Sequence, residues 1–178
     1  EAFISCLNDK KLFEFIEQNN IENKDLLYLH YLGYLALRNL DSEEHYNNLK
    51  KYALSNFDHL HESLQKATIV YLINYCTRKL KRNNSYKYKL ELNKNFKLYL
   101  KYKLYKLAGE NFIRSDIFIT ILSNFFAVGK ITEAIKFLED NIESIQPSHR
   151  KNMTAIANAL LQFEKKDFGE SLKHASMI

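Results

Sequence analysis

The sequence predicts an all-α fold built from antiparallel helical hairpins, and three observations support that prediction. The chain has 178 residues but only four glycines and one proline, so it is poor in the residues that punctuate β-rich folds. Its apolar residues recur at spacings of three and four, the period of an amphipathic helix. One glycine separates two such apolar patterns, where a hairpin would turn.

The clearest hairpin extends from Asp116 to Pro147. One stripe of its first helix carries large apolar residues, namely Phe118, Ile121, Leu122 and Phe125. Ser115 or Asp116 is expected to cap this helix, because a short side-chain oxygen accepts hydrogen bonds from first-turn amides. Gly129 is expected to adopt the left-handed conformation of the turn. The second helix has an apolar face of Ile131, Ala134, Ile135, Leu138 and Ile142, and Pro147 is expected to end it.

This hairpin resembles a tetratricopeptide repeat. The residues at the family's positions are Phe118, Ile121, Phe125, Gly129, Ile131, Ala134 and Leu138, whereas Leu122 and Asn141 depart from its small residues. A second partial match contains Ala155, Ala159, Phe163, Asp167, Phe168, Ser171 and Leu172, with Lys166 in place of the turn glycine. Ala134 and Ser171 are 37 residues apart, against a family period of about 34. Leu32 and Gly33 form a third, weaker match, to the Leu-Gly pair of the family's first helix.

The resemblance implies a short right-handed α-solenoid of stacked hairpins. Residues 1–178 would form a single helical-repeat domain, and we expect that domain to be a fragment of a longer solenoid. The family role implied is a non-enzymatic protein–protein interaction scaffold that binds a peptide or partner helix on a concave surface. Cytoplasmic localisation is favoured, and the oligomeric state is left open.

The remaining helices are predicted from apolar spacing and capping residues. A short helix is expected from Asn8 or Asp9 to about Asn20, after the end of another in residues 1–7. The next begins at Asn23 or Asp25, with a main stripe of Leu26, Leu29, Leu32, Gly33 and Ala36 and with Tyr31 on another side. Asp41 and Glu44 are expected to form a capping box at the start of the third helix.

Four further helices complete the prediction. One from about Glu62 to Arg82 is apolar around most of its circumference, which is typical of a helix buried between neighbours. The next begins near Ser85 and reaches Leu107, and Gly109 stops it. The last two run from Ser148 to Lys165 and onward from Asp167.

No catalytic, cofactor-binding or metal-binding motif is found, and an enzyme is the least supported class. His59 and His61 are two apart and point to different helix faces, so they favour a solvated loop over a metal site. Ser148 and His149 follow a proline and predict a helix start. Cys6 and Cys76 lie in apolar helical contexts and are expected to be reduced core thiols. No run of apolar residues is long enough to cross a membrane.

The stretch from Arg78 to Lys106 is strongly basic, with eleven Lys or Arg and one acid, Glu91. On a helix, one stripe collects Lys87, Lys94, Lys97 and Lys101. Lys89 and Lys103 fall on the apolar side and would have to extend outward to water. A solvated charge run, a surface for an acidic protein partner, and a surface for nucleic acid or anionic lipid all fit this pattern.

Overall fold

The computed structural model describes residues 24–105 and 111–178, together with Lys11, Glu14 and Gln18. Regular secondary structure in the described residues is helical, which confirms the all-α fold class. The sole β-type pairing among them is an isolated parallel bridge between Ile113 and Ile145. Of the helix predicted before Asn20, the described Lys11, Glu14 and Gln18 are helical, and its other residues lie outside the described part. The thiol of Cys6 and the predicted stop at Gly109 also lie outside it.

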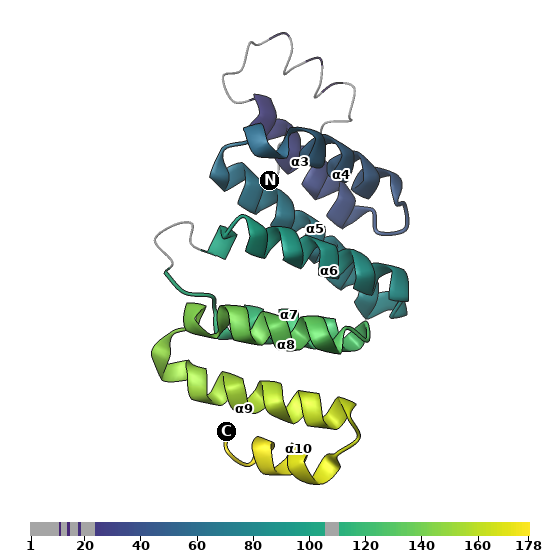
Figure 1. Ribbon diagram of the computed structural model, residues 1–178. Helices are drawn as coiled ribbons and strands as arrows, with labels where there is room; N and C mark the ends of the chain where they lie inside the picture. The colour runs from purple at the N-terminus through teal and green to yellow at the C-terminus, as the bar shows by residue number, and fades with distance from the viewer. Residues whose placement is uncertain (1–10, 12–13, 15–17, 19–23, 106–110) are drawn as a thin grey trace. The chain divides into compact units, whose positions relative to one another are not determined.

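The described residues contain eight α-helices (Figure 1). They are α3 (Lys24–Arg38), α4 (Glu44–Asn56), α5 (Glu62–Asn83), α6 (Tyr86–Lys101), α7 (Ser115–Ala127), α8 (Ile131–Asn141), α9 (Pro147–Glu164) and α10 (Phe168–Ala175). Short 3₁₀ turns follow α4 at Phe57–His59 and α8 at Ile142–Ser144. The chain forms two compact units, Glu1–Tyr75 and Cys76–Ile178, so the boundary falls inside α5.

Two predicted helix ends are wrong. The basic helix α6 ends at Lys101 and not at Leu107, because Lys103 has a left-handed φ of 52° that a helix cannot contain. Pro147 opens α9 instead of ending α8, which stops earlier at Asn141. Proline suits a first helical position because that residue's amide needs no partner within the helix.

Two predicted helix caps are also wrong, whereas the predicted start of the last helix at Asp167 is confirmed. No Asp41–Glu44 capping box forms, because the Glu44 amide donates to the Ser42 hydroxyl at 3.3 Å. The residue before α7 is Arg114, so Ser115 already lies inside the helix and does not cap it. Asp167 does cap α10, accepting a hydrogen bond from the Glu170 amide at 3.1 Å.

In the first unit, a close approach between helices α3 and α5 depends on Gly33. A Cβ atom at Gly33 would lie 2.5 Å from the Tyr71 ring, so the ring can pack there only against a glycine. The Tyr71 hydroxyl hydrogen-bonds His30 Nδ1 at 2.9 Å. Four of the five residues of the predicted stripe are buried, and Leu26 is exposed. Tyr31, which was predicted on another side, is also buried, so the buried face of α3 is wider than that stripe.

In the second unit, the pair α9–α10 repeats the pair α7–α8 with a shift of 37 residues. The first helices end at Ala127 and Glu164, and the second helices begin at Ile131 and Phe168. The turns have left-handed residues at the same register, Gly129 with φ 72° and Lys166 with φ 63°. The Gly129 prediction is confirmed.

Both turns close with the same backbone hydrogen bonds. The amides of Gly129 and Lys130 donate to the carbonyls of Phe126 and Phe125, each at 2.9 Å. At the second turn, the amides of Lys166 and Asp167 donate to the carbonyls of Phe163 and Gln162, also each at 2.9 Å. This pattern is the Schellman motif, which satisfies the last carbonyls of a helix.

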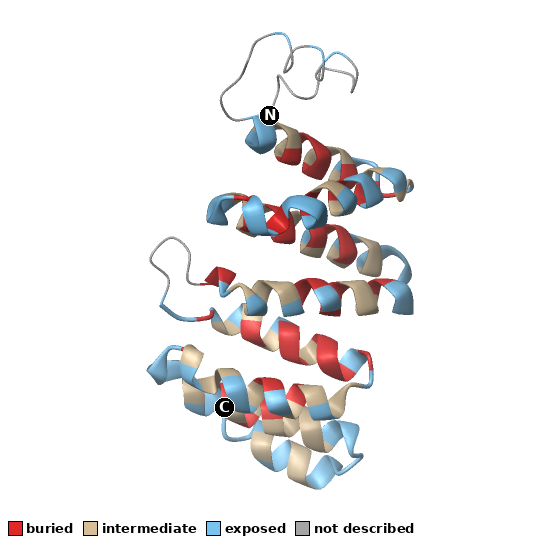
Figure 2. Ribbon diagram, turned by 45° about the horizontal axis from the view of Figure 1, so that its top comes forward, coloured by how far each residue is buried: buried red, intermediate tan, exposed pale blue. Residues whose placement is uncertain are grey.

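The core of the second unit is centred on α7, whose predicted stripe is buried throughout (Figure 2). Phe137 of α8, which the predicted apolar face omits, is also buried, and its ring centroid is 4.9 Å from that of Phe118. Ala134 is completely buried in α8, as expected for a small residue at a close helix crossing.

Candidate functional site

The four lysines that the sequence places on one stripe all lie on α6, and Lys87, Lys94, Lys97 and Lys101 are all exposed. Leu92 and Phe96 on the other side of α6 are buried. Lys89 is half-buried, whereas Lys103 lies beyond the helix end and is exposed, so the expectation for Lys103 on an apolar helix face is wrong.

Carboxylates already neutralise part of this lysine stripe. Lys94 forms an ion pair with Glu91 at 2.9 Å within α6. Lys97 forms one at 2.6 Å with Glu133 of α8, which also binds Lys130 at 2.7 Å. The hydrogen bonds from Lys130 and Lys97 hold the pKa of Glu133 below its ordinary range. Two of the four lysines therefore face a protein carboxylate.

Aromatic rings hold other cations of this region. The ammonium groups of Lys79 and Lys87 lie 5.2 Å and 5.5 Å from the Tyr88 ring centroid, and that ring is buried. The Lys101 ammonium lies 4.8 Å from the centroid of Tyr102. The rings fix these ammonium groups near the surface by cation–π attraction. Tyr88 is thus part of the core and not an exposed stacking platform.

An open cleft of about 430 Å³ lies at the starts of α7 and α9. Its lining includes Ser115 and His149, and the Ser115 hydroxyl lies 2.7 Å from His149 Nδ1. Arg114 binds Asp116 at 2.8 Å; desolvation raises the pKa of that carboxyl, but Arg114 outweighs it and holds the pKa below its ordinary range. Ser148 and His149 stand in the first turn of α9, as predicted.

His59, His61 and Cys76 lie in the settings that the sequence predicted, at the surface for the two histidines and in the core for the thiol. His59 is exposed in the 3₁₀ turn, and exposed His61 bonds the Ser63 hydroxyl at 2.8 Å. The described residues contain no group of side chains able to hold a metal. Cys76 is a buried thiol that accepts a contact from Asn95 Nδ2 at 3.7 Å. No described helix combines the length and apolar content needed to cross a bilayer.

Three large apolar side chains are exposed where α9 and α10 meet: Phe163, Phe168 and Leu172, which we call the α9–α10 edge. Their exposed fractions are 56%, 55% and 72%. The rings of Phe163 and Phe168 are in contact, with centroids 5.5 Å apart, and Leu172 follows Phe168 by one helical turn. The edge is therefore one contiguous apolar surface.

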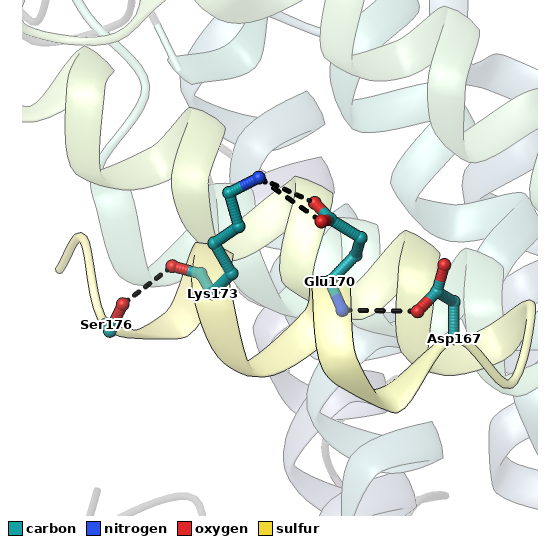
Figure 3. A network of polar contacts seen from close by, with 4 residues as sticks. All are labelled: Asp167, Glu170, Lys173 and Ser176. Atoms are coloured by element: carbon teal, nitrogen blue, oxygen red, sulfur yellow. Dashed lines mark hydrogen bonds and ion pairs between the residues drawn. The ribbon is translucent and has the colours of Figure 1, made fainter.

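The polar residues of α10 interact along the helix itself (Figure 3). Asp167 caps Glu170, Glu170 pairs with Lys173 at 3.2 Å, and the Ser176 hydroxyl donates to the Lys173 carbonyl at 2.7 Å. Ser171 anchors the helix by donating to the Ala159 carbonyl of α9 at 2.9 Å. Sequence reasoning did not identify this edge as a site, although the 37-residue register could have indicated it.

Comparisons with protein-family models, with curated proteins and with solved structures find no match to this chain.

Proposed function

We propose that this protein is a non-enzymatic interaction module that binds a peptide or helix of another protein at the α9–α10 edge. The observation that supports this proposal is the cluster of three large apolar side chains, each more than half exposed. Contiguous exposed apolar patches are typical of interaction surfaces, because removing them from water favours association.

The repeated hairpin geometry adds support. A 37-residue structural register, with matching left-handed turns, fits the tetratricopeptide-like hairpins expected from the sequence. Stacked helical hairpins commonly serve as scaffolds for peptides or partner helices, and on this proposal the protein does the same.

Selection of peptides from a random library displayed on phage tests this function. We expect the wild-type protein to enrich peptides whose binding is lost on Leu172→Asp, because a carboxylate would be desolvated at the contact. Leu54→Asp is the matched control, since Leu54 is also exposed but lies on α4. Peptides that bind the wild type and Leu172→Asp equally would contradict the proposal.

A second candidate is an anionic polymer, such as single-stranded nucleic acid, bound through α6. The observation that favours it is the exposure of all four stripe lysines on one helix. Replacing the four by Gln should abolish a low-salt gel shift and flatten its salt dependence, since each lost phosphate contact removes released counterions. The ion pairs to Glu91 and Glu133 make this the weaker candidate.

A control with the same change in net charge sharpens that gel-shift experiment. It replaces four exposed lysines outside α6, namely Lys51, Lys136, Lys151 and Lys165. A specific α6 surface requires the control to bind nucleic acid like the wild type. No shift at micromolar protein, or an equal loss in both variants, would reject the candidate.

A further inference from the structure

We propose that Ser85, in the turn between α5 and α6, is a phosphorylation site for a protein kinase that selects basic residues before its acceptor. This proposal is independent of the partner binding described above. Three observations support it: the basic residues that precede Ser85, the backbone and exposure of the turn, and a start of α6 that has no side-chain cap.

The basic residues form a pattern that occurs twice in the chain. Two Ser or Thr residues have basic residues at both the third and the fourth position before them. Lys81 and Arg82 precede Ser85 in this way, and residues 150–151 precede Thr154. A kinase cleft lined by carboxylates binds such a pair by charge complementarity, which also fixes the register of the bound segment. The linear pattern therefore gives two candidate acceptors and does not distinguish them.

The structure distinguishes the two acceptors by their backbone. A kinase binds the residues around its acceptor in an extended conformation, which brings the hydroxyl into line with the γ-phosphate of the nucleotide. Thr154 is half-buried in the middle of α9 and is followed by buried Ala155. Ser85 has an extended backbone, with φ −70° and ψ 130°, and follows Asn84, whose left-handed φ of 43° separates the two helices. Ser85 is therefore the acceptor that a kinase can reach.

The residues on either side of Ser85 are open to a second protein. Lys81 and Arg82 are exposed in the last turn of α5, where a helix end opens at low cost. The Tyr86 ring, directly after Ser85, is 57% exposed and can enter an apolar pocket beside the kinase's active site. The Tyr86 hydroxyl donates to the Val128 carbonyl at 3.4 Å, a long hydrogen bond that costs little to break. The turn thus combines an accessible hydroxyl with charged and aromatic groups.

The reaction takes its phosphoryl group from a nucleoside triphosphate. The Ser85 oxygen forms a bond to the γ-phosphorus while the bond from that phosphorus to the oxygen bridging the β-phosphate breaks. The nucleoside diphosphate leaves with the electron pair of the broken bond, and the hydroxyl proton passes to a base in the kinase. The Ser85 hydroxyl makes no capping hydrogen bond to α6, so the modification displaces none.

The phosphate changes the start of α6, a helix of 16 residues with no acidic residue in its first turn. Residues 78–90 contain six basic residues and no acidic one, so a phosphoserine with roughly two negative charges lowers their net charge from six to about four. A phosphate at this position accepts hydrogen bonds from first-turn amides and interacts favourably with the positive end of the helix dipole. Phosphorylation should therefore stabilise the start of α6.

Incubation of the full chain with the catalytic subunit of cAMP-dependent protein kinase, ATP and Mg²⁺ tests the acceptor, with the modified residues identified by mass spectrometry. We expect phosphate on Ser85, and we expect that peak to be lost in Ser85→Ala. Arg82→Gln should lower kcat/KM at Ser85 by at least about tenfold, because the kinase loses an ion pair. Lys101→Gln makes the same change in net charge on an exposed residue of α6 and should behave like the wild type.

Peptides separate the contribution of the sequence from that of the fold. Peptides 78–90 and 147–160, the second with Thr154→Ser so that both present serine, should both be phosphorylated. In the folded protein with the same Thr154→Ser change, Ser85 should be modified at least about tenfold faster than position 154, because the middle of a packed helix opens rarely. Equal rates at the two positions, or a Ser85 that is modified in neither the peptide nor the folded protein, would overturn the assignment. A Ser85 modified in the peptide alone would overturn it as well.

Hydrogen–deuterium exchange measures the consequence of the modification. After phosphorylation, amides at the start of α6 should exchange about two- to fivefold more slowly, because an anion at the N-terminal end stabilises the helix, and those at the start of α7 should not change. Ser85→Asp should show part of this slowing without the kinase. Unchanged exchange at the start of α6 after complete phosphorylation would overturn the effect on the helix.

Discussion

At the scale of single residues, the two left-handed turns make opposite predictions. Gly129→Val should destabilise the fold by about 1–3 kcal/mol, because a β-branched residue is strained at positive φ. An added side chain there meets nothing within 4 Å, so the loss would come from the backbone alone. Lys166→Gly should stabilise by up to about 1 kcal/mol by removing the same strain. Urea unfolding measures both, and equal stabilities would contradict a left-handed turn.

A substitution at Gly33 should destabilise for a different reason, because a neighbouring ring leaves no room for a side chain. Gly33→Ala should cost about 1–3 kcal/mol, since its Cβ would lie 2.5 Å from the Tyr71 ring. Combined with Tyr71→Ala, the same change should cost much less, because the obstructing ring is gone. Additive losses in thermal unfolding of the double variant would show that Tyr71 is not the reason for the glycine.

At the scale of elements, the crossing of α7 and α8 depends on Ala134. Ala134→Phe should destabilise by about 1–3 kcal/mol, because the site is completely buried and a ring would force the helices apart. Lys136→Phe on the exposed face of α8 is the matched control and should change stability little. A soluble Ala134→Phe protein with the wild-type melting temperature would reject a close crossing there.

The contact between α6 and α8 should give stability a dependence on acid pH. The folded-state pKa of Glu133 is lowered by Lys130 and Lys97, so this stabilisation is present at neutral pH and is lost as pH falls through the folded pKa. From about pH 5 to about pH 3, the wild type should lose more stability than Glu133→Gln. The difference should stay below about 1 kcal/mol, because the side chain of Glu133 is 40% exposed. Parallel curves of unfolding free energy against pH for the two proteins would contradict this prediction.

At the scale of the whole molecule, local stability should be uneven across the described helices. Six residues of α7 are buried, whereas none of α10 is. Amides of α10 should therefore exchange with deuterium much faster than those of α7, because a helix of eight residues without a buried residue opens locally at low cost. Hydrogen exchange followed by mass spectrometry checks this, and equal protection would contradict it.

The net charge of the basic stretch along the sequence differs from the charge that the folded surface presents. The sequence places ten more basic than acidic residues between Arg78 and Lys106, and correctly puts four lysines on an exposed stripe. It cannot show that Glu133, more than thirty residues later, pairs with Lys97. The local excess of positive charge is therefore smaller on the folded surface than along the chain.

The sequence by itself determined the helical class, the apolar stripe of α7, the turn at Gly129 and the 37-residue spacing of Ala134 and Ser171. These follow from local rules, because helical periodicity and a left-handed turn depend on residues a few positions apart. Only the tertiary structure decided that Phe137 is buried, that Gly33 faces a ring, and that Phe163, Phe168 and Leu172 are exposed. Burial depends on which helix packs where, and apolar periodicity is the same whether or not a neighbour covers it.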